Sequence, residues 1–407
     1  MEQVYDVIII GGGPGGMSAA IYAARGRLKT LILEEKRKAG GQARTTWEME
    51  NYPGFKETTG PELMENFREH AVKFGAEFKK ETVISIKPSG FWKIIKTKSG
   101  QEYKTKAVIV STGAEPRILG VKGEKEFRGR GVSYCATCDA DFYQDLDVVV
   151  IGNGNTAIEE SIYLTKFVNK VTIIVIHDQG ILDADKILQE QAFSNEKIEF
   201  VWSSVLEEIR GDELVDRVLI KNIKNGEMTE LSANGVFVFV GTVPRTEFLK
   251  GLVRLSKFNY VETNEMMETN VPGIYAVGDV RVKFLRQVIT AASDGATAAV
   301  AVEKYLEQEE YWRKNVMEVA EPVLVVFWSP VNQDSLKLLG QLEAMKLAEK
   351  GVKMVKIDTY RNKLIADRYQ IKEIPAVIIF EHEEEVKRIV QPSEPEIEDF
   401  IAGVVTV

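Results

Sequence analysis

Cys135 and Cys138 are the only two cysteines in the 407-residue chain, and they stand in the sequence Cys135-Ala-Thr-Cys138. This spacing brings two thiols close enough to form a disulfide, and such a pair can cycle by thiol–disulfide exchange. Asp139 follows directly and could protonate a leaving thiolate. The pattern predicts redox chemistry at Cys135, Cys138 and Asp139, in a reducing compartment, which indicates the cytoplasm.

Two glycine-rich turns follow apolar runs and repeat one another along the chain. Residues 11–16 follow the run 6–10, and residues 152–157 follow the run 147–151, with the same offset up to Tyr22 and Tyr163. Each copy predicts a strand, a glycine turn, a helix and a second strand of a buried parallel sheet. Glycines in such a turn let the backbone approach a pyrophosphate at the helix N-terminus. The repeat therefore predicts two nucleotide-binding domains.

Gly and Pro residues mark the expected domain boundaries. The segments 112–116 and 241–244 are rich in these residues and predict short crossings that could act as hinges. We expect residues 114–242 to form a domain inserted into a first domain made of residues 1–113 and 243–315. Residues 319–407 have their own order of strands and helices, with an amphipathic helix expected over 336–350. The fold class is α/β throughout.

Composition excludes several classes of function. The formal net charge is −9, which argues against nucleic acid or a membrane surface as a partner. We find no apolar run near the ~18 residues that span a bilayer, and the acidic N-terminus does not resemble a signal peptide. The three histidines stand far apart in the sequence, so we expect no metal site. The chain is expected to be a soluble enzyme.

Several motifs together resemble the low-molecular-weight thioredoxin reductases, and they match in order and spacing over residues 1 to about 310. The matching segments are Gly40-Gly-Gln42, Glu48-Met-Glu-Asn-Tyr-Pro-Gly54, Gly129-Arg-Gly-Val-Ser-Tyr-Cys-Ala-Thr-Cys-Asp139, Gly154-Asn-Thr-Ala-Ile-Glu-Glu160, Gly278-Asp-Val280 and Arg286-Gln287. The resemblance implies two Rossmann-like three-layer domains, one inserted in the other. It also implies FAD in the first domain, a nicotinamide nucleotide in the inserted domain, a homodimer, and a rotation of the inserted domain during turnover.

The resemblance assigns roles to individual residues. In this family the second cysteine faces the flavin and the first attacks the protein substrate, a thioredoxin or glutaredoxin-like protein, which assigns Cys138 and Cys135 respectively. The implied FAD contacts are Gly11, Gly13, Pro14, Gly15, Gly16, Glu34, Gly41, Gln42, Asn51, Val83, Gly278, Asp279, Arg286, Gln287 and Val288. The implied nucleotide contacts are Gly152, Gly154, Asn155, Thr156, Ala157, Glu159 and Asp178.

One departure from the family pattern concerns the electron donor. Relatives that use NADPH carry arginines after the second nucleotide-binding repeat, whereas this chain has Asp178 and Asp183 at those positions. Carboxylates there would repel a 2′-phosphate but could accept from a free 2′-hydroxyl. This pattern predicts either NADH as the donor or a different donor such as a ferredoxin. The retained glycine turn and Glu159 favour NADH.

A second departure is the C-terminal module, which resembles thioredoxin itself. Pro375 stands where that fold has a cis proline, but Asn332-Gln-Asp-Ser335 occupies the position of the active-site cysteines. Without thiols the module cannot exchange disulfides, and we expect it to steady a dimer or to guide the protein substrate. A non-catalytic flavin sensor or scaffold is a further alternative, but the complete Cys-Ala-Thr-Cys-Asp sequence argues against it.

Overall fold

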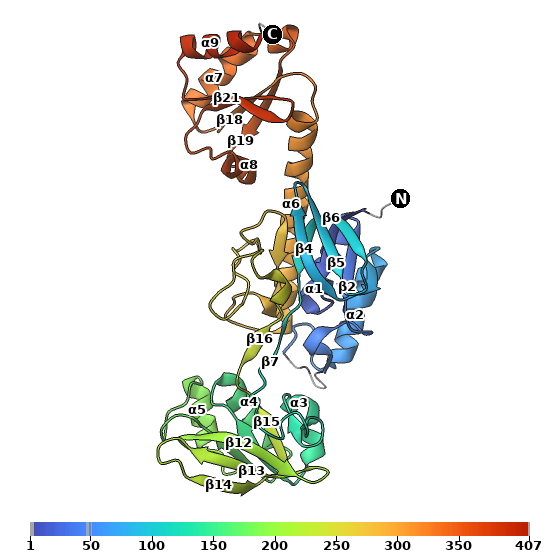
Figure 1. Cartoon of the computed structure of the whole chain (residues 1–407), viewed down its shortest axis with the longest axis vertical. Helices are drawn as coiled ribbons and strands as arrows, with labels where there is room; N and C mark the ends of the chain where they lie inside the picture. The colour runs from blue at the N-terminus through green and yellow to red at the C-terminus, as the bar shows by residue number, and fades with distance from the viewer. Residues whose placement is uncertain (1–3, 46–48, 50, 406–407) are drawn as a thin grey trace. The chain divides into compact units, whose positions relative to one another are not determined.

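The computed structural model describes residues 4–45, 49 and 51–405 and divides into two compact units, one up to Val302 and one from Glu303 (Figure 1). The division falls inside the long helix α6 (Val288–Trp312). The first unit contains a mixed sheet, a parallel sheet and a smaller antiparallel sheet, and the second unit contains one mixed sheet.

The first sheet carries the first glycine turn at the end of its central strand. Its strands, in sheet order, are β3 (Glu77–Lys80), β2 (Thr30–Glu34), β1 (Val4–Ile10), β6 (Glu102–Val110), β5 (Trp92–Thr97) and β4 (Val83–Ser89), with β17 (Ile274–Ala276) paired to β6. β1 runs parallel to both of its neighbours and is buried from Val7 to Ile10. A strand buried on both faces needs a continuous apolar run, which is the pattern in the sequence. The helices α1 (Pro14–Arg25) and α2 (Gly60–Lys73) belong to this part.

The parallel sheet lies in the chain between β6 and β17. Its strands, in sheet order, are β11 (Ile198–Val201), β10 (Lys170–Ile174), β9 (Asp147–Ile151), β15 (Gly235–Val238) and β8 (Val132–Ser133). One core packs its strands against α3 (Ala136–Asp139), α4 (Asn155–Leu164) and α5 (Lys186–Phe193), through residues such as Ala136, Leu164 and Phe237.

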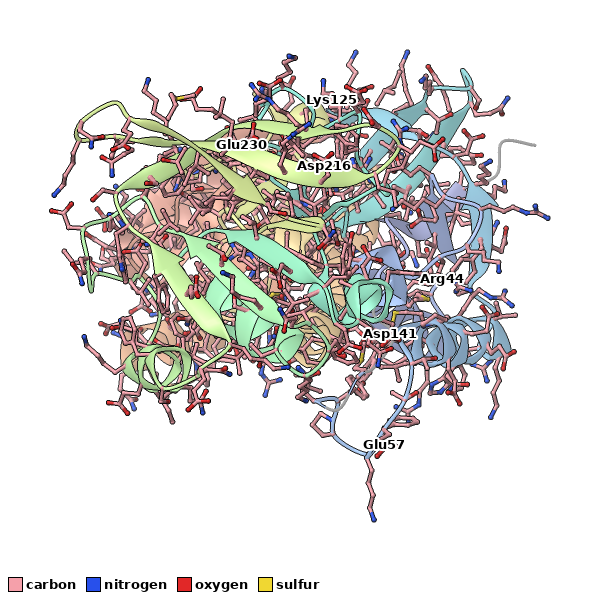
Figure 2. All side chains as sticks on the ribbon, turned by 90° about the horizontal axis from the view of Figure 1, so that it is seen from below. Arg44, Glu57, Lys125, Asp141, Asp216 and Glu230 are labelled. Atoms are coloured by element: carbon pink, nitrogen blue, oxygen red, sulfur yellow. The ribbon has the colours of Figure 1, made fainter. Side chains whose placement is uncertain are left out.

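The opposite face of the parallel sheet packs against an antiparallel sheet. Its strands are β12 (Ser204–Gly211), β13 (Val215–Asn222) and β14 (Met228–Ser232). Val218 and Ile220 of β13 are buried against Val149 of the parallel sheet, whereas neighbouring positions carry charges. Asp216 and Glu230 are two of these charged side chains (Figure 2), and Arg217 pairs with both. The result is a three-layer arrangement of helices, parallel sheet and antiparallel sheet.

The two crossing segments pair with one another, although the sequence predicts only breaker-rich connections there. β7 (Ala114–Pro116) and β16 (Thr242–Pro244) form a two-stranded antiparallel ribbon. Gly113 and Gly241 adopt positive φ values of 68° and 94° at its ends, a conformation that glycine allows. Arg245 follows β16 and contacts Glu35 at 2.6 Å and Glu115 at 3.5 Å.

The second unit is built on a four-stranded sheet with helices on both faces. Its strands, in sheet order, are β19 (Lys353–Asp358), β18 (Val323–Trp328), β20 (Ala376–Glu381) and β21 (Glu384–Val390), and its helices after α6 are α7 (Gln333–Ala344), α8 (Lys363–Arg368) and α9 (Glu394–Val405). Trp312, at the end of α6, and Val316, in the π-helical turn Arg313–Met317, pack into the core of this unit. The compact unit therefore begins before the sheet does.

The predicted helix over 336–350 is wrong in its extent. α7 ends at Ala344, Lys346 adopts a left-handed φ of 47°, and a separate 3₁₀ turn covers Leu347–Lys350. The apolar spacing continues through the break because Leu342 and Leu347 both face the same core. Periodicity alone could not reveal the change of backbone direction between them. The remaining short helical turns are Gly41–Thr45, Ala140–Tyr143, Glu247–Leu249 and Gly278–Val280.

Candidate active site

The first glycine turn connects β1 to α1 and has no room for side chains at two positions. A Cβ added to Gly11 would lie 2.4 Å from the Ser111 carbonyl oxygen, and one added to Gly16 would lie 2.0 Å from the Gly11 carbonyl oxygen. Glu34, at the end of β2, accepts hydrogen bonds from the N–H groups of Gly12 at 2.7 Å and Lys36 at 2.8 Å. The Glu34 carboxylate thus fixes the glycine turn. It also lies at the place where a ribose hydroxyl of the cofactor is expected.

A second turn of the same sheet presents an unsatisfied carboxylate. Asp279, in the turn Gly278–Val280 after β17, has a buried Oδ1 with no hydrogen-bond partner among the described residues. Burial raises the pKa of Asp279, and the nearby Lys283 and Arg286 oppose this rise. Arg286 also has a buried Nε without a hydrogen-bond partner in the described part, and its guanidinium lies over the Tyr260 ring. Buried polar groups are normally paired, so these two point to a polar ligand.

Three residues that sequence reasoning missed support this turn. Asp294, on α6, accepts from the Gly278 N–H at 2.9 Å and from Lys283 Nζ at 2.8 Å, and Arg281 Nη1 lies 3.4 Å from it. Asp294 and Lys283 are nearly buried, so the contacts are shielded from water. The sequence signal that could have found Asp294 is that it is the single acidic residue among the small and apolar residues at the start of α6.

The other predicted FAD residues fall into separate groups. Asn51 Nδ2 donates to Gln287 Oε1 at 3.2 Å, so the fold brings together two positions that lie far apart in the sequence. Gly41 packs on the glycine turn, where an added Cβ would lie 3.3 Å from Gly13 Cα. Gln42 donates to the carbonyl of Ala114, the first residue of the crossing ribbon, and Val83 packs against the core of the sheet. The close-packed glycine turn and the orphaned Asp279 oxygen fit a dinucleotide with ribityl hydroxyls, as expected for FAD.

The second glycine turn connects β9 to α4 and shows the same steric limit. A Cβ added to Gly152, whose φ is 136°, would lie 2.3 Å from the Phe239 carbonyl oxygen. Asn155 exchanges two hydrogen bonds with Asp185, which fixes the start of α4. Glu159, one turn further along, has its pKa raised by burial and by Asp185. Gly154, Thr156 and Ala157 lie in the same turn.

The two carboxylates that depart from the family pattern already have partners. Asp178 accepts from Lys224 Nζ at 2.6 Å and from Ser203 Oγ at 3.0 Å, and these contacts hold the pKa of Asp178 below its usual range. Asp183 contacts His177 Nε2 at 3.1 Å. Lys224 lies in the β13–β14 connection, and no local pattern in the sequence relates it to Asp178. This cation is a site residue that sequence reasoning missed.

The cysteine motif follows β8 at the edge of the parallel sheet. Cys135 is disulfide-bonded, and the chain has one other cysteine, Cys138, whose side chain lies outside the described residues. Ser133 Oγ donates to Asp139 Oδ2 at 2.6 Å and accepts from the Cys135 N–H at 3.1 Å. β8, β15 and β9 are parallel, so the cysteine motif and the second glycine turn leave the sheet at the same edge.

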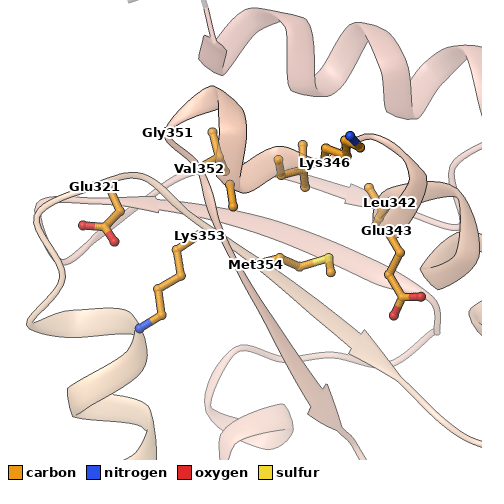
Figure 3. A pocket seen from close by; sticks show the side chains of 10 residues that line it. Glu321, Leu342, Glu343, Lys346, Gly351, Val352, Lys353 and Met354 are labelled. Atoms are coloured by element: carbon orange, nitrogen blue, oxygen red, sulfur yellow. The ribbon is translucent and has the colours of Figure 1, made fainter.

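The second unit offers no thiol at the corresponding place. Asn332 caps α7 by accepting from the Ser335 N–H at 2.7 Å, and the Ser335 hydroxyl is buried. A pocket of about 570 Å³ in this unit is lined by Leu342, Leu347, Met354 and charged neighbours (Figure 3), and none of its lining residues is a predicted site residue. No acidic, histidine or cysteine cluster suited to a metal occurs among the described residues, and none of the described helices could span a membrane.

Comparison with known proteins assigns both parts of the chain. The pyridine nucleotide-disulphide oxidoreductase family model matches residues 5–296, and the thioredoxin family model matches residues 303–403. The thioredoxin reductase of Peptoclostridium acidaminophilum is 49 % identical over 314 residues, which cover 75 % of this chain and 98 % of that protein. The thioredoxin reductase of Bacillus subtilis is 45 % identical over 308 residues, covering 75 % of this chain and 96 % of that protein.

Solved structures agree with these relatives. The crystal structure of Lactococcus lactis thioredoxin reductase in its FR conformation is 45 % identical, with a TM-score of 0.67, and the match covers 75 % of this chain and 99 % of that one. These findings confirm the expected fold class and the family resemblance, and the family uses FAD and a nicotinamide nucleotide. The chain therefore belongs to the pyridine nucleotide-disulphide oxidoreductase family and is a flavin-dependent disulfide oxidoreductase of the thioredoxin reductase type.

Proposed function

We propose that this enzyme passes electrons from NADH, through FAD and the Cys135–Cys138 pair, to a thioredoxin or glutaredoxin-like protein. The observation that carries the proposal is that the disulfide-bonded Cys135 and the second glycine turn leave the same edge of one parallel sheet. Ligands of open parallel sheets bind at this edge. The redox pair thus belongs to the nucleotide-binding domain. A rotation of that domain would present the disulfide and the nicotinamide to the flavin in turn.

The residues described above would each have a definite task. Gly11 and Gly16 let the turn pack closely on the protein itself, which leaves the backbone at Gly13 free to approach the FAD pyrophosphate. Asp279 accepts a hydrogen bond from a ribityl hydroxyl, and Arg286 donates to the same cofactor. When bound, FAD supplies two-electron transfer between a nicotinamide and a disulfide. Asp139, fixed by Ser133, supplies or takes up a proton at the sulfur that leaves when the disulfide opens.

NADH is the proposed donor because carboxylates stand where a 2′-phosphate would need cations. Asp178 and Asp183 both lie just after β10, the position at which an acidic residue accepts from a ribose 2′-hydroxyl. Lys224 offsets part of the negative charge at Asp178, so the preference over NADPH is expected to be moderate. The relatives do not favour the two alternatives, a ferredoxin donor and a non-catalytic flavin sensor.

The proposed assembly is a homodimer in the cytoplasm. The family resemblance supports the homodimer. The cytoplasm is supported by the use of both cysteines for redox chemistry, which leaves none for a structural disulfide. Light scattering during size-exclusion chromatography tests the dimer directly.

The test of the donor is anaerobic stopped-flow spectroscopy of the holoenzyme. Flavin absorbance is followed after mixing with NADH, NADPH or a reduced ferredoxin. We expect NADH to reduce the flavin fastest at equal concentration. Equal or faster reduction by NADPH would contradict the preference, and reduction by ferredoxin alone would replace the proposed donor.

A further inference from the structure

A carboxylate of the nucleotide-binding helix contacts the redox turn. Glu160, on α4, accepts a hydrogen bond from the Ala136 N–H through Oε2 at 2.9 Å. Ala136 is buried and directly follows Cys135. We propose that Glu160 is a positioning residue for the Cys135–Cys138 pair and that its negative charge lowers the reduction potential of the pair. This inference rests on the redox role proposed above.

The turn also packs into the core of its domain through Ala136. β8, which leads into it, is only two residues long and pairs with β15 at the sheet edge. Ser133 and Asp139 bind one another, but both belong to the same short segment as Cys135. Glu160 is on a different element, so its hydrogen bond fixes the turn against α4. A buried N–H without this acceptor would also cost free energy.

The charge of Glu160 acts on the redox equilibrium. Reduction breaks the S–S bond, takes up two electrons from the reductant and, with two protons from water, leaves two sulfhydryls, one of which can ionise to a thiolate. A carboxylate next to the residue that bears the sulfur disfavours the thiolate by like-charge repulsion. The reduced pair is thereby less stable, and its electrons pass more readily to a protein disulfide. A low potential suits a pair that must reduce another disulfide.

The charge is tested with Glu160→Gln, which removes the charge and keeps a side-chain oxygen that can accept from Ala136. The holoenzyme is equilibrated in dithiothreitol redox buffers, the thiols are trapped by alkylation, and mass spectrometry gives the reduced fraction of the pair. We expect the equilibrium constant for reduction to rise about three- to tenfold, which is about 15–30 mV for a two-electron couple. Glu190→Gln, an exposed carboxylate on α5, is the matched control and should cause no shift. An unchanged or lower potential in Glu160→Gln would overturn the charge effect.

Positioning is tested by comparing Glu160→Gln with Glu160→Ala. The prereduced enzymes react with dithiodipyridine, and the rate of exchange is measured. We expect the alanine variant to react about threefold or more slower than the glutamine variant, because both have lost the charge but only the alanine variant has lost the acceptor. Equal rates in both variants, with equal flavin content, would overturn the positioning role.

These readouts are separate from the proposed electron path. Dithiothreitol reduces the pair without passing electrons through the flavin, so the shift in Glu160→Gln can be measured even if NADH fails to reduce the pair. Failure of NADH would contradict the proposed function, whereas failure of the shift would contradict only the role of Glu160.

Discussion

Lys224 Nζ lies 2.6 Å from Asp178 Oδ1, so the β13–β14 connection places a cation beside the carboxylate that is expected to face the nucleotide ribose. Ser203 Oγ donates to the same carboxylate. Asp178 remains ionised because these contacts lower its pKa. Its charge, however, is partly neutralised, and both side chains are more than half exposed, so dissolved salt screens the pair. Nucleotide preference therefore depends on two residues rather than one.

We predict that Lys224→Met increases the preference for NADH over NADPH and that Asp178→Asn decreases it. Removing the cation leaves Asp178 to repel a 2′-phosphate, whereas removing the carboxylate leaves Lys224 available to bind that phosphate. Each change is expected to alter the ratio of the two kcat/KM values about three- to tenfold, less at high salt. Lys221→Met, on the same hairpin, is the control. If both variants kept the unsubstituted ratio of kcat/KM for NADH to kcat/KM for NADPH, Asp178 and Lys224 would have no part in nucleotide preference.

We predict that Asp294→Asn weakens FAD binding and lowers the melting temperature. Asp294 accepts from the Gly278 N–H and contacts Lys283 and Arg281, and a neutral amide would leave these nearly buried cations without a counter-charge. Loss of a charged hydrogen bond costs about 1.5–3 kcal/mol, so the Kd for FAD should rise about 10-fold to 150-fold.

The measurement for this prediction is fluorescence titration of the apoprotein with FAD, which does not depend on turnover. Asp212→Asn, an exposed position between β12 and β13, provides the control. An unchanged FAD affinity in Asp294→Asn would show that the turn Gly278–Val280 does not need this support.

The residues that could be predicted from sequence are those whose chemistry depends on local spacing. The two glycine turns are short patterns, and each is found at the end of a strand as expected. Cys135–Cys138 is also a short pattern, although the strand β8 that precedes it is not predicted. Strand positions in the second unit also follow directly from apolar runs, as for Val323–Trp328. Local spacing is sufficient to predict these residues because their geometry is determined within one short segment of the chain.

The residues that sequence reasoning missed are joined to the site by tertiary contacts. Lys224 reaches Asp178 from a hairpin, Glu160 reaches Ala136 from a neighbouring helix, and Asp294 reaches Gly278 from α6. Each is an ordinary polar residue in its own segment. The pairing of β7 with β16 is similar, because neither breaker-rich segment shows strand periodicity by itself. Such contacts depend on the packing of elements that lie far apart along the chain.

We predict that Cys135→Ser and Cys138→Ser each abolish disulfide reduction but keep the flavin bound. The chain has no other cysteine that could take over the relay, and neither residue lies in the glycine turn or the Gly278–Val280 turn. Both purified variants should be yellow, and NADH should still bleach their flavin absorbance. Full reduction of thioredoxin by either single variant would contradict the role of the pair.

We predict that removing residues 311–407 leaves flavin reduction by the nucleotide intact. All predicted FAD and nucleotide residues precede residue 290, and the relatives match about three quarters of this chain over nearly their whole length. The cut removes Trp312, whose side chain is buried in the core of the second unit and would otherwise be left exposed.

The expected change after this truncation is in the KM for the protein substrate or in the dissociation constant of the dimer. Asn332 and Ser335 carry no thiol, so the module cannot relay electrons. Loss of electron flow from the flavin to the Cys135–Cys138 pair would show that the module has a part in electron transfer.

The path of the electrons is tested most directly by labelling thiols after anaerobic reduction with NADH. The holoenzyme is mixed with NADH in the absence of any protein substrate, quenched with an alkylating agent, and analysed by peptide mass spectrometry. The account predicts that both Cys135 and Cys138 become labelled as the flavin is reduced, and that neither is labelled without NADH. A reduced flavin beside a Cys135–Cys138 pair that remains unlabelled would contradict it.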